Sequence, residues 1–506
     1  MNKYKGILLF IIITAIAVFY ILTTREGQVW GEDFAQYIQH AKNIVERKPY
    51  GNTGYIFTLL PPFPPGTKAY PPIFPLFLVP IYGLFGPNLA IMKIGIILFF
   101  IASLVVIYLL FKQRLGFYCL FFTIMIVGFN PYLWDFKENI VSDMPFLFFS
   151  CLCLYVLERR LTVKRGEPNM LSLLGTACLL YLAFGTRTIG ITLLLAYIVY
   201  NIVKLRRISP SLVKIIIFYT ILVGIQQVII RAFPTYHKEL FITFKSPFTN
   251  IIFYIKGVAI LFHNGYIVGS TIIFAAYLIG LALLGYIKRV REGATIVEFH
   301  TLIYIVAIIM WPHKDIRYLI PIIPLFLFYT FYGIDKGINI LIGRRAFLVI
   351  SVIGCVSSYS AKYTTTNYGR IEGVTNRECI ELFNYIKENT SFNDALIFTR
   401  PRVLSLYTER KSAVFPFKWR DEEIWQYFKE INATHIVVGS EHFKIGKAKA
   451  FGIDQRYVIS FVRKYESNLY LVYSNINFKV YKILWKEGEG DESIEVSKKN
   501  YSFVPG

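Results

Sequence analysis

Residues 7–22 read ILLFIIITAIAVFYIL, an unbroken apolar run that follows Lys3 and Lys5. About 20 apolar residues cross the hydrocarbon core of a bilayer, so this run is slightly short for a span. A short apolar run after lysines is also typical of a signal peptide, but no small-residue cleavage site follows it here. We therefore interpret it as an uncleaved first transmembrane helix with a cytoplasmic N-terminus.

The composition of the whole chain agrees with a membrane protein. Of its 506 residues, 55% are hydrophobic and only 17% are charged, whereas soluble domains carry about 25% charged residues. The net charge of +22 would suggest nucleic-acid binding in a soluble protein. Because the basic residues lie between long apolar runs, we assign them to cytoplasmic loops near anionic lipid and predict no nucleic-acid partner.

Further apolar segments predict an α-helical polytopic membrane protein with about 11 transmembrane helices. Segment 72–86 is short and contains Pro75 and Pro80, so we place it at the membrane interface. The short even-numbered loops are then all basic, which gives a cytoplasmic N-terminus and an extracytoplasmic C-terminal part in the cell membrane. The predicted spans after the first are 88–111, 116–133, 144–157, 170–186, 188–203, 211–230, 266–287, 296–311, 318–334 and 346–361.

The chain divides into three predicted regions. Residues 1–361 form the transmembrane domain. Residues 362–483 form an extracytoplasmic α/β domain, because strand-like runs such as ALIFT (395–399) and THIVVG (434–439) alternate with amphipathic helical segments. Residues 484–506 form a polar tail that we expect to be disordered. The outer loops of the transmembrane domain are 24–71, 134–143, 231–265 and 311–318.

The first outer loop carries the first candidate site. Glu32 and Asp33 lie shortly after the first span, with Tyr37 close behind. A carboxylate beside apolar walls has a raised pKa and can act as a general base, although a solvated turn or helix cap explains the pair equally well. Near the end of this loop, Lys68 precedes Tyr70 and two prolines, where it could pair with a lipid phosphate or simply extend to the interface.

Three later segments place further polar residues on the same predicted side. Asp143 opens a span and could cap its helix or serve as a second carboxylate of the site. Arg187 lies between two helices, where an arginine must be paired or at the surface. The segment WPHKDIRYLIP (311–321) supplies His313, Arg317 and Tyr318. A solvated hairpin is the simple explanation, but an arginine there can bind phosphate oxygens with two hydrogen bonds.

Taken in order, these motifs resemble the GT-C superfamily of membrane glycosyltransferases, which use polyprenyl-phosphate sugars. Glu32-Asp33 with Tyr37 resembles the Asp-Glu motif of protein O-mannosyltransferases and of the aminoarabinose transferase of lipid A. The segment HKDIRYLIPIIP (313–324) is similar to a motif of dolichol-dependent mannosyltransferases. The acidic pair is reversed here, and the spacing to Tyr37 aligns Asp33 with the catalytic aspartate. A lysine directly precedes two prolines in the aminoarabinose transferase, whereas here Tyr70 does and Lys68 lies two residues earlier.

The resemblance implies an inverting glycosyltransferase of the GT-C-like fold. It would move a hexose or pentose from a polyprenyl-phosphate donor in the membrane lipid to an extracytoplasmic acceptor hydroxyl of a protein, lipid or cell-envelope glycan. Asp33 and Asp143 would be catalytic, and Lys68, Arg187 and Arg317 would bind the donor phosphate. The remaining residues expected to line the site are Glu32, Tyr37, Tyr70, His313 and Tyr318.

Several alternatives remain open at the level of sequence. The superfamily includes metal-dependent and metal-independent members, and no convincing set of ligands is evident, so a divalent metal ion is left undecided. A transporter or flippase of lipid-linked glycans is the main rival, and it would place polar groups at mid-bilayer in broken helices. A non-catalytic assembly protein whose C-terminal domain binds envelope polymer is a third interpretation.

Overall fold

The computed structural model describes residues 3–57, 69–162, 169–206, 208–230, 246–262, 268–338, 341–417, 419–440 and 450–485. The chain forms two compact units. The first, which we call the transmembrane unit, comprises Met1–Thr53 and Pro65–Val374. The second, the C-terminal unit, comprises Thr375–Gly506 together with Gly54–Pro64 from the first predicted outer loop. Of the predicted disordered tail, residues 486–506 lie outside the described residues.

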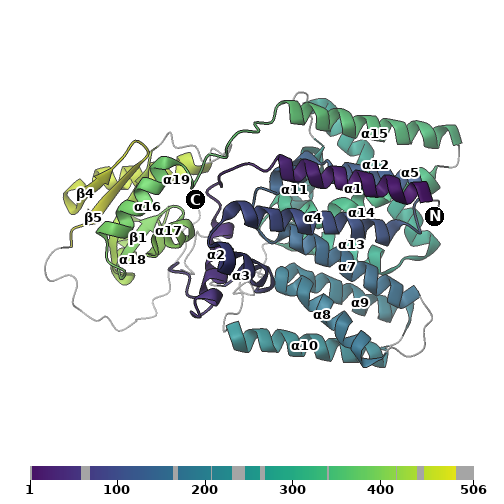
Figure 1. The fold of residues 1–506 in the computed structure, drawn as a ribbon, viewed down its shortest axis with the longest axis horizontal. Coiled ribbons are helices and arrows are strands. Elements are labelled where there is room, and N and C mark those ends of the chain that lie inside the picture. The colour runs from purple at the N-terminus through teal and green to yellow at the C-terminus, as the bar shows by residue number, and fades with distance from the viewer. Residues whose placement is uncertain are drawn as a thin grey trace. The chain divides into compact units, whose positions relative to one another are not determined.

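A helix occupies each of the predicted spans, and several of these helices run alongside one another (Figure 1). The most extensive packing joins α4 to α7, α12 to α14, α8 to α10 and α9 to α13. Six helical segments of the described residues are long and apolar enough to cross a membrane, and the chain is a multi-pass membrane protein. The helices are α1 (Lys3–Leu22), α4 (Leu89–Phe111), α5 (Phe117–Gly128), α7 (Asp143–Thr162), α8 (Met170–Thr186), α9 (Ile191–Lys204), α10 (Pro210–Ile230), α12 (Val268–Gly293), α13 (Ile296–Met310), α14 (Ile323–Tyr332) and α15 (Leu341–Thr364).

Shorter helical elements fill the connections between these helices. The proline-rich segment predicted to lie at the interface is helix α3, and it keeps Pro80 inside the helix. Helix α11 was not predicted, because its sequence falls in the segment 231–265, which the hydropathy pattern assigns to an outer loop. The elements are α2 (Glu32–Val45), α3 (Ile73–Phe85), α6 (Pro131–Phe136), η1 (Thr188–Gly190), α11 (Ser246–Leu261), η3 (Ile316–Ile322) and η4 (Gly333–Gly337).

The two ends of the transmembrane unit differ in their polar contacts. At one end, Arg114 pairs with Glu158 and also donates a hydrogen bond to the Thr295 hydroxyl at 3.1 Å. Arg289 pairs with Glu298 at 3.3 Å at the same end. We call this the basic end, because the loops predicted to be cytoplasmic are found here. The opposite end carries α2, α3, α6 and η3, and we call it the site end.

The C-terminal unit is a five-stranded mixed sheet in the order β2-β1-β3-β5-β4. Strand β1 pairs in parallel with β2 and β3, while β5 pairs antiparallel with β3 and β4. A core of buried apolar side chains, including Ile397, Phe428, Ile436 and Phe461, lies between the sheet and its helices. The elements are β1 (Ala395–Phe398), β2 (Lys411–Val414), β3 (Ala433–Gly439), β4 (Leu469–Ser474), β5 (Phe478–Ile483), α16 (Arg377–Asn389), α17 (Pro401–Thr408), α18 (Asp421–Glu430), α19 (Ala450–Lys464) and η5 (Glu466–Asn468).

Candidate functional site

Helix α2 presents the acidic pair at the site end. Its first turn contains Glu32 and Asp33, where the positive end of the helix dipole favours carboxylates. The apolar face that holds the helix in place includes Phe34 and Ile38, both buried. Since residues four apart lie on the same face, Asp33 and Tyr37 project toward the same side of the helix.

Asp33 is engaged through both of its carboxylate oxygens. Arg317 Nη1 donates to Asp33 Oδ2 at 2.5 Å, and the Tyr70 hydroxyl donates to Asp33 Oδ1 at 2.6 Å. Arg317 also pairs with Asp315, with 3.1 Å between Nε and Oδ2. The side chains of Asp33 and Arg317 are each 26% exposed, so this ion pair is partly open.

A second carboxylate pairs with a second arginine beside the first pair. Arg187 Nη1 donates to Asp143 Oδ1, and the Asp143 side chain is only 2% exposed. The other oxygen of Asp143 is buried and accepts no hydrogen bond from the part of the chain that the structure describes. The neighbouring Ser142 hydroxyl lies 2.8 Å from the Tyr37 hydroxyl, which links the start of α7 to α2.

Tyr318 joins the two ion pairs into one cluster. The guanidinium carbons of Arg187 and Arg317 lie 5.5 and 5.9 Å from the centroid of its ring, a distance typical of cation–π contacts. Its backbone carbonyl accepts a hydrogen bond of 3.0 Å from the Tyr304 hydroxyl. Two arginines therefore contact one aromatic ring, and three carboxylates, those of Asp33, Asp143 and Asp315, pair with them.

Aromatic side chains from the first loop border this cluster. The ring of Tyr37 lies 4.8 Å from the ring of Tyr70 and 4.8 Å from that of Phe74. Burial raises the pKa of Tyr37 well above its usual range, so its hydroxyl stays protonated at physiological pH. Tyr37 can therefore donate a hydrogen bond but does not serve as a base.

His40 and Tyr50 complete the site and were not identified from the sequence. His40 Nε2 accepts the backbone N–H of Tyr70 at 3.1 Å, and its Nδ1 lies 2.9 Å from the Tyr50 carbonyl. Its ring stacks on that of Tyr50 with 4.1 Å between centroids. The Tyr50 hydroxyl donates to the Tyr70 carbonyl at 2.8 Å. His40 lies seven residues after Asp33, a spacing that places both on one helical face and could have revealed it.

The remaining predicted site residues are Glu32, His313 and Lys68. Glu32 is half-buried beside Asp33 at the start of α2. The ring of His313 packs edge-on against the indole of Trp311, with 6.3 Å between centroids. Lys68 lies outside the described residues. Within the described ranges, no group of three or more His, Cys, Asp or Glu side chains is arranged to hold a metal ion.

A buried charge network fixes the segment that leads into α2. Lys93 Nζ donates to Glu138 Oε2 at 2.9 Å and to the Gly27 carbonyl at 2.7 Å. Lys137 donates to the Thr23 carbonyl at 2.9 Å and pairs with the other oxygen of Glu138. Burial raises the pKa of the Glu138 carboxyl, but the two lysines outweigh it and hold that pKa below its usual value. Glu138 is therefore an ionised anchor at neutral pH.

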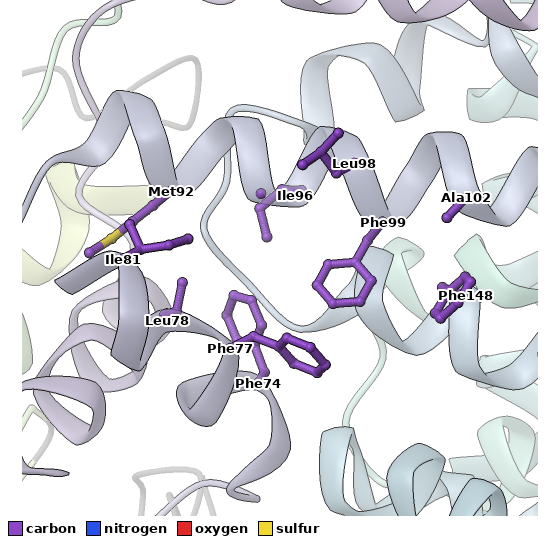
Figure 2. A pocket seen from close by; sticks show the side chains of 11 residues that line it. Phe74, Phe77, Leu78, Ile81, Met92, Ile96, Leu98, Phe99, Ala102 and Phe148 are labelled. Atoms are coloured by element: carbon purple, nitrogen blue, oxygen red, sulfur yellow. The ribbon is translucent and has the colours of Figure 1, made fainter. Parts of the chain in front are cut away.

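The transmembrane unit contains an apolar pocket of about 330 Å³. Helices α3, α4 and α7 line it, with Phe77, Met92 and Phe148 among the contributing side chains (Figure 2). Phe74 lines the same pocket and also contacts Tyr37. Phe74 is therefore the side chain through which the pocket wall meets the aromatic border of the site.

Comparisons with known proteins bear on the fold. No protein-family model and no curated protein sequence matches the chain. Among solved structures, it is similar to ArnT from Cupriavidus metallidurans bound to undecaprenyl phosphate, with a TM-score of 0.59 and 12% identity over 95% of this chain and 98% of that one. It is also similar to the archaeal oligosaccharyltransferase AglB from Archaeoglobus fulgidus in complex with an inhibitory peptide and a dolichol-phosphate. That match has a TM-score of 0.55 and 11% identity, covering 87% of this chain and 70% of that one.

A third match is the arabinofuranosyltransferase AftD from Mycobacteria, with a TM-score of 0.58 and 11% identity. It covers 97% of this chain but 40% of the longer AftD chain. Identities this low report the fold and leave the roles of individual residues undecided. The chain has the fold of the GT-C membrane glycosyltransferases over about 95% of its length.

Proposed function

We propose that this protein is an inverting glycosyltransferase that moves a sugar from a polyprenyl-phosphate donor to an extracytoplasmic acceptor hydroxyl. The observation that carries the proposal is the cluster in which Asp33–Arg317 and Asp143–Arg187 flank Tyr318. Direct displacement of a phosphate by a hydroxyl needs a carboxylate to take the proton and cations to receive the phosphate. Both kinds of group meet in this cluster.

The resting ion pair suggests how the base is released. A donor phosphate that binds Arg317 competes with Asp33 for the same guanidinium, which can hold two phosphate oxygens side by side. Asp33 Oδ2 then becomes available to the acceptor hydroxyl, while Tyr70 still orients the other oxygen. The acceptor oxygen attacks the anomeric carbon, its proton passes to Asp33, and the bond from that carbon to the phosphate oxygen breaks.

The departing phosphate gains one negative charge as this bond breaks, because a phosphodiester becomes a phosphomonoester. Arg317 and Arg187 are placed to offset that charge as it develops. We propose Lys68 as a further cation and Asp143 as the group that orients the sugar or the acceptor. The buried, unshared oxygen of Asp143 is suited to accept a hydroxyl hydrogen bond.

The apolar pocket supports a lipid-linked donor. It is lined by aromatic and aliphatic side chains, and one of them, Phe74, contacts Tyr37. ArnT was solved with undecaprenyl phosphate and AglB with a dolichol-phosphate, both polyprenyl phosphates on the same fold. These observations support the donor class, whereas the identity of the acceptor does not follow from them.

The position of the ion pairs favours an enzyme over a transporter of lipid-linked glycans. The pairs at Asp33 and Asp143 lie at the site end, and those at Glu158 and Glu298 lie at the basic end. A transporter would place such groups midway along broken helices, where the substrate crosses the bilayer.

The proposal is tested by Asp33→Asn, which keeps the shape of the side chain and removes the base. Membranes containing the variant should transfer labelled sugar from polyprenyl-phosphate donors about 100-fold to 10,000-fold more slowly than wild type. Glu46→Gln, which removes a carboxylate at the other end of α2, serves as the control and should transfer normally. Wild-type transfer by a normally inserted Asp33→Asn protein would exclude Asp33 as the base.

A further inference from the structure

Residues 23–31, which we call the connector, join α1 to α2 and are held on two sides within the transmembrane unit. On one side the connector pairs in parallel with the segment that follows α15. The Ile371 N–H donates to the Glu26 carbonyl at 2.8 Å, and the Val374 N–H donates to the Gln28 carbonyl at 2.9 Å. These backbone hydrogen bonds use even-numbered carbonyls of the connector.

Two buried lysines hold the connector on its other side. Lys93 Nζ, on α4, donates to the Arg25 carbonyl at 2.9 Å and to the Gly27 carbonyl at 2.7 Å. Lys137 Nζ donates to the Thr23 carbonyl at 2.9 Å. The carbonyls of the connector thus alternate between its two partners, as they do in a strand that pairs on both sides. The two ammonium groups take the place of the second neighbouring strand.

Glu138 balances the charge of the lysines and also binds the connector itself. Lys93 Nζ lies 2.9 Å from Glu138 Oε2, and Lys137 pairs with Oε1. The Arg25 backbone N–H donates to the same Oε1 at 3.1 Å. The two lysines and Glu138 are each exposed by 4% or less. In a site this closed, the loss of a lysine leaves backbone carbonyls of the connector without a replacement donor, which is costly.

The connector leads directly into the turn of α2 that carries Asp33. Gly31 is the N-cap of this helix and provides no side-chain cap for the first turn. Because the first N–H groups of a helix have no partner within it, the position of this turn depends on the chain that precedes it. Asp33 must meet both Arg317 and Tyr70, at 2.5 and 2.6 Å. A displaced connector would therefore shift Asp33 relative to both partners.

We propose that Lys93, Lys137 and Glu138 are positioning residues, which fix the connector and thereby hold Asp33 in place for the reaction. The role of Asp33 as the base rests on the function proposed above, but the mechanical link from the connector to α2 does not. A shift of about 1 Å in a catalytic group can lower a rate about 100-fold, so a loosened connector should lower turnover. The donor KM should stay the same, because the three residues bind the connector and not the donor.

Lys93→Met tests the proposal because it separates the hold on the connector from the balance of charge. Methionine is an unbranched side chain of similar length, and Glu138 keeps its pair with Lys137. No single charge is then left buried without a partner, so the variant should fold. The Arg25 and Gly27 carbonyls, however, lose the ammonium group that donates to them.

Arg114→Met is the matched control for a general loss of stability. It removes the partner of Glu158 from a largely buried ion pair at the basic end, the opposite end of α4 from Lys93. Because a buried carboxylate is then left unpaired, this variant should lose at least as much thermal stability as Lys93→Met. It leaves every contact of the connector in place.

Hydrogen exchange of the full chain in lipid nanodiscs reads out the link without any substrate. Lys93→Met should speed exchange of the Ile371 and Val374 amides, which donate to the connector, by about tenfold or more. It should also speed exchange of the Gln36 and Tyr37 amides, which bond to the carbonyls of the first turn of α2. The control variant should match wild type at all four amides.

In transfer assays, Lys93→Met should lower kcat about tenfold or more at an unchanged donor KM, whereas Arg114→Met should keep both values. An equal fall of kcat in the two variants would overturn the proposal, because the lysine would then act only through stability. Unchanged exchange of the two α2 amides in Lys93→Met would also overturn it, because the connector would then not reach the catalytic turn. If wild type itself shows no transfer, the proposed function fails and the exchange result still decides the link.

Discussion

Arg317 Nη1 lies 2.5 Å from Asp33 Oδ2, although 284 residues separate the two in sequence. A carboxylate held this closely by a guanidinium is a poor base, since the positive charge favours its ionised form. Under the proposed mechanism the donor phosphate draws Arg317 away from Asp33. Binding of the donor and activation of the base are therefore one event.

Replacing Arg317 by lysine tests whether transfer needs only a positive charge at this position or also the planar guanidinium group. Arg317→Lys keeps the positive charge but cannot hold two phosphate oxygens side by side. We expect kcat/KM for transfer to fall about 100-fold, with a raised donor KM. Arg377→Lys, at a site that is 88% exposed on α16, should transfer like wild type. Equal activity of Arg317→Lys and wild type would show that simple charge is sufficient.

The pair of Asp143 with Arg187 should dominate the stability of the site. Asp143→Asn leaves the Arg187 guanidinium facing a neutral amide, and loss of one partner of a buried ion pair costs about 3–5 kcal/mol. The double variant Asp143→Asn with Arg187→Gln should recover part of this loss, because no unpaired charge remains. Thermal unfolding in detergent would measure both, and additive losses would mean that the two residues are not coupled.

Hydropathy and charge were enough to place the long helices. Apolar runs such as 88–111 are necessarily buried or in lipid, so composition alone identifies α4 and its counterparts. Helix α2 could not be placed in this way, because it is amphipathic and lies in a loop rich in polar and aromatic residues. Helix α11 was missed for another reason. Its apolar run is equally compatible with a segment at the membrane interface. Only its packing against α12 and α13 identifies it as a helix of the transmembrane unit.

The candidate site was only partly predictable for a related reason. Asp33, Asp143, Arg187 and Arg317 could be named because each is a charge next to an apolar segment. Their pairing could not be named, since it depends on how α2, α7 and η3 meet in three dimensions. His40 lies seven residues after Asp33 on the same face of α2, but that spacing does not tell which groups its ring contacts. Its role appears only when the backbone of Tyr70 is placed beside it.

The Glu138 network should make the stability of the fold depend on pH in the acidic range. The folded protein holds the Glu138 pKa below its ordinary value of 4.5, so this carboxylate stabilises the fold above about pH 4.5 and loses that effect as pH falls through its lowered pKa. Glu138→Gln leaves Lys93 and Lys137 without their partner and should lower Tm at pH 7. The difference in Tm from wild type should narrow as pH falls below 4.5, and a constant difference from pH 7 to pH 3 would contradict the prediction.

His40 should position Tyr70 and thereby orient Asp33. A backbone N–H can only donate and a carbonyl can only accept, so the contacts of His40 fix a neutral ring with its proton on Nδ1. His40→Phe keeps the stacking on Tyr50 but loses both hydrogen bonds, and we expect kcat to fall about 100-fold at a similar donor KM. His40→Gln can offer an oxygen to the Tyr70 N–H and should recover part of kcat. Equal kcat values for these two variants would argue for a purely steric role.

The apolar pocket should determine how the enzyme responds to the length of the donor lipid. Ala102 lines the pocket on α4, and Ala102→Trp would fill part of its volume of about 330 Å³. We expect KM for a long polyprenyl-phosphate donor to rise about tenfold, because about 1.4 kcal/mol of apolar contact would be lost. A donor with a much shorter chain should be affected less, since it makes fewer contacts there. Val105→Trp places the same indole on an exposed face of α4 and should leave both KM values unchanged. Equal increases for long and short donors in Ala102→Trp would show that the lipid chain lies elsewhere.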